Sequence, residues 1–305
     1  MKARTPKVVC IGSCNADMVA LIDRFPTADD RVIVNSLFIK SGGGSNTAVG
    51  LARLGVPVRQ ISLIGDDKFG SMLIADLNKE GVDTSKIIIR HGASGIAFCA
   101  VKKNGERNLY VHYGVGETLS EKDVNFNEIN NAEFLYLSGM NGSKIIDVYQ
   151  RASALTNTKT IFDPGCLAEK GLGKLQVILK NSYVFMPNEL EAEMLTGMKG
   201  VKAAETLLKA GSKIVILKQG SEGCILAMQG AIIPVSTDKV NAVDTTGAGN
   251  AFAAGFIEAQ LKGKDLLDSC KYANMISALS VKKIGARTIP SGKEIDSIKR
   301  KFDIQ

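Results

Sequence analysis

The chain has 305 residues, of which 45% are hydrophobic, which is enough for one large α/β domain or two ordinary ones. The formal net charge is +7, but the basic residues are dispersed and not interleaved with aromatic ones, which disfavours a nucleic-acid-binding protein. No apolar run reaches the roughly 20 residues of a membrane span, and no His/Cys cluster has zinc-ligand spacing.

The N-terminal stretch "MKARTPKVVCIGS" is basic and passes directly into a strand-like run. It has neither the apolar region nor the small-residue cleavage site of a signal peptide. The six cysteines are scattered without a CxxC pair, as expected of reduced core thiols rather than a disulfide framework. We therefore expect a cytoplasmic protein that does not bind membranes.

Apolar, β-branched runs alternate with helical patterns along most of the chain. Strands are predicted at 7–13, 58–65, 132–139, 159–165, 182–188 and 213–220. Helices are predicted between them at 45–55, 66–81, 143–156, 189–197 and 201–211. This alternation is typical of an α/β fold with a doubly wound, mostly parallel sheet and helices on both faces. Such sheets bind ligands at the C-terminal ends of their strands.

Two segments interrupt this alternation. Residues 17–40 and 94–113 contain short strand-like runs with no helices between them. Residues 103–106, "KNGE", carry a hairpin turn signal at Asn104-Gly105. We interpret these segments as a small antiparallel sheet that projects from the main one. Since no repeat or linker is visible, the chain 1–305 is expected to be a single domain with this outgrowth inserted in it.

The stretch "AVDTTGAGNAFAAGF", residues 242–256, has the features of a phosphate-binding turn. Gly247, Ala248 and Gly249 leave backbone N–H groups uncovered just where an apolar helix begins, and the helix dipole adds positive potential. A glycine-rich helix start is also compatible with tight packing alone. The chain contains neither GxxxxGK[ST] nor GxGxxG, so neither a P-loop nor a dinucleotide fingerprint accounts for the stretch.

Three further stretches place polar residues where strands and helices meet. "SGGGSNTA" (41–48) puts Asn46 after three glycines, so that backbone can approach a polar ligand. "GSCNADM" (12–18) puts Asn15 and Asp17 just past the first strand, where a carboxylate can take two sugar hydroxyls. "MPNELEAEMLTG" (186–197) puts Asn188 three residues before Glu191, which by itself is equally the pattern of a helix capping box.

Together these stretches resemble the ribokinase (PfkB) family of carbohydrate and nucleoside kinases, in order and spacing and over essentially the whole chain. "GGGSNTA" is similar to the family's first signature, "DTTGAGN" to the second, usually DTxGAGD, and "PNELE" to its NxxE motif. The resemblance implies a doubly wound α/β domain with a small β lid. It also implies ATP-dependent phosphorylation of a hydroxymethyl group of a small sugar.

The resemblance assigns the sugar to one set of matching residues. Asn15 and Asp17 would hold sugar hydroxyls, and Gly43 and Asn46 would complete that pocket. Residue 250 would contact the hydroxyl that attacks the phosphate. The anion hole for the transferred phosphate would be formed by Gly247, Ala248 and Gly249.

ATP and its cations are assigned to a second set. Asn188 and Glu191 would organise Mg²⁺ through water, and Asp244 and Thr246 match a site for a monovalent cation, commonly K⁺. The residues expected along the nucleotide are Lys218, Gly220, Gly223 and Asn274.

The family's catalytic base is an aspartate, and this chain has Asn250 in its place. An amide does not accept a proton usefully near pH 7, although it still hydrogen-bonds a hydroxyl. General-base assistance contributes about 10²–10⁴-fold. Two explanations remain open: an inactivated or very slow kinase, which the intact remaining motifs favour, and a natural non-catalytic sugar- or nucleotide-binding relative.

The substrate also remains open. Ribokinases proper carry a lysine in the glycine run (GGKGAN) that "GGGSN" lacks. They also place a glutamate after the mid-chain strand, where this chain has Ser138, Gly139, Met140 and Asn141. The substrate is therefore expected to be a small sugar, with a nucleoside as the alternative. The apolar face of the outgrowth, "VIVNSLFI", is expected to pair two chains into a homodimer.

Overall fold

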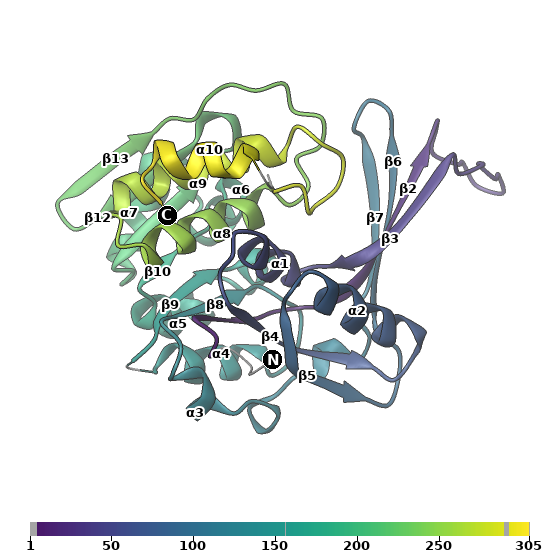
Figure 1. Ribbon diagram of the computed structural model, residues 1–305, viewed down its shortest axis with the longest axis horizontal. Coiled ribbons are helices and arrows are strands. Elements are labelled where there is room, and N and C mark those ends of the chain that lie inside the picture. The colour runs from purple at the N-terminus through teal and green to yellow at the C-terminus, as the bar shows by residue number, and fades with distance from the viewer. Residues whose placement is uncertain (1–4, 156, 290–292, 305) are drawn as a thin grey trace.

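The computed structural model describes residues 5–155, 157–289 and 293–304, and within them the strands form two sheets (Figure 1). The larger has nine strands in the order β13-β12-β11-β10-β9-β8-β1-β4-β5. All neighbours in it run parallel except the pairs β11–β12 and β12–β13. Its strands are β1 Val8–Ile11, β4 Val58–Gly65, β5 Asp83–Arg90, β8 Phe134–Ser138, β9 Lys159–Asp163, β10 Val184–Phe185, β11 Ile214–Lys218, β12 Cys224–Met228 and β13 Ala231–Val235.

Helices cover both faces of this sheet, and successive residues of β1 show why. Val8 and Cys10 join the core beneath one layer of helices, while Val9 and Ile11 join the core beneath the other. Strands buried on both faces read as continuous apolar runs, because alternate side chains point to opposite sides. The first layer holds α1 Ser45–Arg53, α2 Lys68–Lys79, α8 Ala248–Leu261, α9 Leu266–Ser280 and α10 Lys293–Lys301; the second holds α3 Phe126–Ile129, α4 Ile145–Ser153, α5 Leu172–Asn181, α6 Glu189–Thr196 and α7 Gly200–Lys209.

The strand order reverses at β1. The chain first proceeds from β1 to β4 on one side, and it later places β8 on the other side of β1. This is the topological switch point at which open α/β sheets bind ligands. The arrangement confirms the predicted doubly wound, mostly parallel sheet with helices on both faces.

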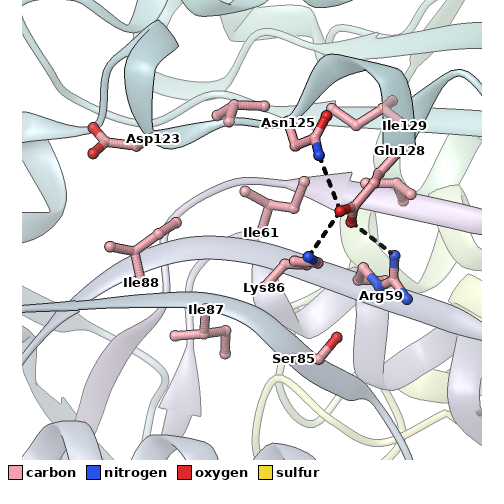
Figure 2. Close-up of a pocket in the computed structure, with 12 residues that line it drawn as sticks. Arg59, Ile61, Ser85, Lys86, Ile87, Ile88, Asp123, Asn125, Glu128 and Ile129 are labelled. Carbon is pink, nitrogen blue, oxygen red and sulfur yellow. Dashed lines mark hydrogen bonds and ion pairs between the residues drawn. The ribbon is translucent and has the colours of Figure 1, made fainter.

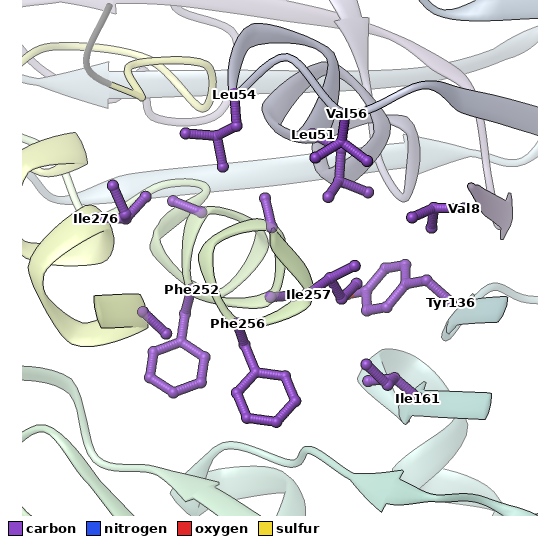
Figure 3. Close-up of a cluster of buried hydrophobic side chains, with 14 of the residues drawn as sticks. Val8, Leu51, Leu54, Val56, Tyr136, Ile161, Phe252, Phe256, Ile257 and Ile276 are labelled. Carbon is purple, nitrogen blue, oxygen red and sulfur yellow. The ribbon is translucent and has the colours of Figure 1, made fainter. Parts of the chain in front are cut away.

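Helix α8 is buried without interruption from Ala251 to Ala259 (Figure 3). Phe252, Phe256 and Ile257 pack between the sheet and the neighbouring helices α1 and α9. A helix that is apolar on all sides can be stable only in such a core. Its position, and therefore the position of its N-terminal turn, is fixed by packing on every side.

The smaller sheet, which we call the lid, projects away from the larger one (Figure 1). Its strands, in the order β3-β2-β6-β7, are β2 Asn15–Ile22, β3 Ser36–Gly42, β6 Gly95–Lys102 and β7 Arg107–His112. The hairpin predicted at 103–106 joins β6 to β7, with Gly105 at a φ of 85°.

Two features of the lid differ from the sequence prediction. The lid is not wholly antiparallel, because β2 pairs with β6 in parallel. The chain leaves the lid after β3 and re-enters it at β6 through α1, β4, α2 and β5, which returns it in the direction of β2. The sequence predicts a strand-like run at 31–39, but its residues 31–35 lie outside β3, which begins at Ser36.

Candidate active site

A cavity of about 570 Å³ lies between the inner face of the lid and the C-terminal ends of β1, β8 and β9. It therefore occupies the topological switch point. It is lined by twelve of the sixteen residues that the sequence singled out: Asn15, Asp17, Gly43, Asn46, Asn188, Glu191, Lys218, Asp244, Thr246, Gly247, Gly249 and Asn250.

Four predicted residues do not line this cavity. They are Ala248, Gly220, Gly223 and Asn274. The side-chain amide of Asn274 donates to the carbonyls of Val235, at 2.9 Å, and Ser236, at 3.3 Å, so it braces the end of β13. Its predicted contact with a nucleotide stays a prediction.

One end of the cavity is built around Asp17. The β2–β3 register places Asp17 beside Lys40, and the Gly43 amide hydrogen-bonds the Asp17 carboxylate. Burial raises the pKa of Asp17 to about 6, against the opposing effects of Arg287 and the Gly43 amide. A Cβ at Gly42 would lie 1.7 Å from Asp17 Oδ2, so any side chain there would displace the Asp17 carboxylate. A carboxylate in this setting can accept two hydroxyl hydrogen bonds.

The other end of the cavity is the turn before α8. Gly247 is the N-cap with a φ of 83°, and a Cβ there would lie 2.3 Å from the Ala286 carbonyl oxygen. The helix itself begins at Ala248, two residues earlier than the sequence suggested, so Asn250 lies in its first turn. The Lys218 ammonium lies 3.4 Å from the position of a Cβ on Gly249. Backbone N–H groups, the helix dipole and an ammonium group thus meet at one place, which suits an anion.

Asn250 is the first member of a buried chain of hydrogen bonds. Thr47 Oγ1 donates to Asn250 Oδ1 at 3.0 Å, and the Thr47 side chain is also hydrogen-bonded to the Tyr136 hydroxyl. The Tyr136 hydroxyl donates a hydrogen bond to Asp163 Oδ2 at 3.2 Å, and the same oxygen accepts a second one from Lys218 Nζ at 2.6 Å. Thr47, Tyr136 and Asp163 were not predicted from the sequence.

The Asn188–Glu191 pair forms the capping box and faces the cavity as well. Asn188 Oδ1 accepts from the Glu191 amide at 2.9 Å, and Glu191 Oε2 accepts from the Asn188 amide at 2.8 Å. Burial, and then the negative charge of Asp163, raise the pKa of Glu191 to about 7. A divalent cation nearby would relieve that repulsion. Within the described residues no group of three or more His, Cys, Asp or Glu side chains could hold a metal ion. The carboxylate oxygens of Glu191 and Asp163 are donors of the kind that Mg²⁺ binds when water and substrate phosphates supply its other ligands.

Asp244 and Thr246 lie beside the turn, under the tip of the lid. The Asp244 carboxylate accepts hydrogen bonds from the backbone amides of Thr246, at 2.9 Å, and Gly285, at 2.8 Å. Burial opposes ionisation, but these hydrogen bonds prevail and lower the pKa of Asp244. Arg107, at the start of β7, donates to Thr246 Oγ1 at 3.1 Å. The lid thus touches the body at the end of the cavity formed by the turn before α8.

A second cavity, of about 230 Å³, lies between β4, β5 and α3 (Figure 2). Its charged groups pair with one another: Glu128 forms ion pairs with Lys86, with Nζ 2.9 Å from Oε1, and with Arg59, with Nη1 3.6 Å from Oε2. Asn125 also donates to Glu128, at 3.0 Å. None of the predicted site residues lines it, so it is not the candidate active site.

Comparisons of the sequence and of the structure with known proteins lead to the same family. The family described as "pfkB family carbohydrate kinase" matches residues 5–292. Ribokinase from Staphylococcus aureus is 30% identical over 311 residues, which cover 96% of this chain and 100% of that protein. The crystal structure of ribokinase from Thermotoga maritima superimposes with a TM-score of 0.86 at 28% identity, covering 96% of this chain and 99% of that one. The structure of Arabidopsis thaliana ribokinase complexed with ribose and ATP has a TM-score of 0.84 at 25% identity, covering 97% and 99%.

Proposed function

The chain belongs to the pfkB family of carbohydrate kinases, and from this membership and the cavity we propose that it binds ATP with a ribose-like sugar for phosphoryl transfer to the sugar's hydroxymethyl group. One observation carries the proposal. A single cavity joins the buried carboxylate of Asp17 to the anion-binding turn at Gly247. A sugar held at the first end therefore presents a hydroxyl to a phosphate held at the second, which is the positioning that phosphoryl transfer requires.

The sugar end supplies acceptors and donors to hydroxyls. Asp17 accepts, and the amides of Asn15 and Asn46 line the same wall. The phosphate end supplies positive potential through the turn and Lys218. Although burial opposes it, Asp163 and Glu191 raise the pKa of Lys218, so its ammonium stays charged.

Two cations complete the proposal. Glu191 would hold Mg²⁺ through water, and Mg²⁺ would neutralise charge on the transferred phosphate. Asp244 and Thr246 would hold K⁺ beside the turn, since K⁺ is bound by oxygen atoms. These residues and the anion-binding turn line the same cavity.

Asn250 makes the proposed transfer slow. Its amide oxygen already accepts from Thr47 and is not a useful proton acceptor near pH 7. The hydroxyl proton then leaves with water or with the phosphate itself, without the about 10²–10⁴-fold assistance of a base. This chain is therefore proposed to bind both substrates and to turn them over very slowly or not at all.

A nucleoside is the second candidate substrate, and the inner face of the lid favours it. Apolar side chains form the roof of the cavity beyond Asp17: Val19, Phe38, Cys99 and Leu109. An apolar roof of this kind suits a flat base attached to the sugar.

A thermal-shift panel separates these substrates. Pentoses, hexoses and nucleosides are tested one at a time with ATP and Mg²⁺, because a ligand that binds only the native state raises the melting temperature without turnover. The proposal expects D-ribose or a related sugar to give the largest shift. If no sugar or nucleoside changes the melting temperature, the proposed function is wrong.

We also propose that two chains pair through the outer face of the lid. Leu37, Ile39 and Tyr110 lie on that face and are 54%, 39% and 62% exposed. Such a patch is typical of an interface. Light scattering after size-exclusion chromatography should give the mass of a dimer, and Tyr110→Glu should give that of a monomer.

We propose a cytoplasmic location for the protein. None of the helices in the described part of the chain is both long and apolar enough to cross a bilayer.

A further inference from the structure

Arg287 lies in the segment after α9 and points into the wall of the main cavity. Its side chain is only 4% exposed. Its guanidinium donates Nε–H to Asn46 Oδ1 at 2.9 Å and Nη1–H to Asp76 Oδ2 at 2.6 Å. It also donates from Nη2 to the Ser41 hydroxyl. One arginine thus joins α1, α2 and the strand β3 of the lid.

The contact with Asn46 fixes the orientation of that amide. A guanidinium has donors only, so Asn46 must turn its oxygen toward Arg287. Its NH₂ group is then free to serve the cavity that Asn46 lines. Without a donor-only neighbour, the oxygen and nitrogen of the amide would be interchangeable.

We infer that Arg287 is a positioning residue for substrate recognition, which holds Asn46 as a hydrogen-bond donor within the cavity that Asp17 serves as an acceptor. This inference rests on the proposed function. It gives the substrate a chemical requirement: one hydroxyl oxygen that accepts from Asn46, and another hydroxyl that donates to Asp17. A polyol or furanose ring with neighbouring hydroxyls meets this requirement.

A purely structural role makes a different prediction, because Arg287 also ties the lid to the body. Asp76 Oδ2 accepts from Ser41 through its amide at 3.0 Å and its hydroxyl at 2.6 Å, as well as from Arg287. A lysine at position 287 keeps a positive charge for Asp76 but has no second, rigidly placed donor for Asn46. Charge and amide orientation are therefore separable by Arg287→Lys.

The test is calorimetric titration of D-ribose and, separately, of ATP. Arg287→Lys should weaken D-ribose binding about tenfold, the effect of one misplaced hydrogen bond, and leave ATP binding unchanged. Arg59→Lys is the matched control: Arg59 is a partly buried arginine, 16% exposed, in the ion-pair network of the second cavity and not in the main one (Figure 2). It should leave D-ribose binding unaltered.

A double-mutant cycle shows whether Arg287 acts through Asn46. In an Asn46→Ala background, Arg287→Lys should have no further effect on D-ribose affinity. An equal tenfold loss with and without Asn46 would overturn the inference, as would unchanged D-ribose binding by Arg287→Lys. If the wild-type chain binds D-ribose but Arg287→Lys changes D-ribose affinity equally with and without Asn46, only the inference fails. If the wild-type chain binds no sugar, both the proposed function and the inference that rests on it are wrong.

Asn46→Asp tests the same point should Arg287→Lys fold poorly. The carboxylate keeps a partner for Arg287 but offers the cavity no donor. D-ribose affinity should therefore fall further in Asn46→Asp than in Asn46→Ala, with the melting temperature maintained. Binding by Asn46→Asp as tight as that of the wild type would contradict the assigned donor role.

Discussion

Residue 250 is where the chain departs from its family's signature, and in the proposed function the amide of Asn250 replaces the carboxylate that would take the proton of the attacking hydroxyl. Asn250→Asp should raise ATP-dependent phosphorylation of D-ribose by about two to four orders of magnitude, or roughly 3–5 kcal/mol of barrier. Thr47 would still donate to the new carboxylate, so the fold should not change. Coupled ADP release with K⁺ and Mg²⁺ measures the gain, with Asn250→Ala as the control. Equal rates for the Asp and Asn chains, with ribose and ATP bound in both, would show that the site is not catalytic.

Asp17 illustrates how binding opposes stability at a single residue. Burial raises the pKa of Asp17 to about 6, above the value of about 3.9 for an unfolded aspartate. Between these values the folded state holds a proton that the unfolded state has released, so this group lowers the free energy of unfolding as pH rises. Asp17→Asn should therefore raise the melting temperature at pH 7, with a difference that shrinks toward pH 4. Scanning calorimetry of both chains checks this.

Sugar binding by Asp17 should have the opposite pH dependence. The ionised carboxylate accepts two hydroxyls, so wild-type affinity for D-ribose should fall as pH drops through about 6. Asp17→Asn should bind weakly at every pH, while ATP affinity stays nearly intact. A wild-type affinity that is flat from pH 5 to 8 contradicts this role for Asp17.

The residues that sequence reasoning missed have partners far away along the chain. Arg287 reaches Asn46 across 241 positions, Asn250 meets Thr47 across 203, and Arg107 meets Thr246 across 139. Motifs identified Asn46, Asn250 and Thr246 because glycine turns and helix starts leave a local pattern. A side chain whose role depends on a distant partner leaves none.

At the scale of elements, the turn before α8 depends on one glycine in particular. Gly247→Ala should abolish ATP binding and destabilise the fold, because a Cβ meets the Ala286 carbonyl and a left-handed conformation costs about 1–2 kcal/mol. Gly249→Ala is the matched variant, since its Cβ meets only Lys218 Nζ at an ordinary distance. Chemical denaturation and ATP titration compare the two. Equal losses in both variants would refute the special role of Gly247.

The elements that the sequence predicted well are those buried on both faces. The strand expected at 58–65 is β4 itself, and α1 ends before Gly55, which has a φ of 86°. The strands not predicted lie at the two edges of the sheet: β5, β12 and β13. β5 mixes polar and apolar residues with little burial, and β12–β13 is a hairpin without the helix that marks a parallel crossover. The parallel pairing within the lid depends on a long excursion that no local pattern reveals.

For the whole molecule, the lid should close on a bound sugar. Its inner face forms the roof of the cavity, and Arg107, at the start of β7, joins the lid to the end of the cavity proposed for phosphate. Closure excludes water, which otherwise accepts the phosphate. Backbone amides of β2, β3, β6 and β7 should exchange hydrogen more slowly when D-ribose is added, whereas those of β9 and β11 should not change. Equal protection of the lid with and without D-ribose contradicts gating.

The burial of α8 on all sides has a consequence for how this protein can be controlled. A helix at the centre of the core opens only when the whole domain unfolds, so its amide protons belong to the slowest-exchanging, most cooperative unit. The turn before the helix is half-exposed and lines the cavity, so ligands and the lid reach it without any opening of the core. The core therefore holds the backbone of the turn in place, while bound ligands, the lid and exchangeable side chains such as that of residue 250 are the parts of the site that can vary.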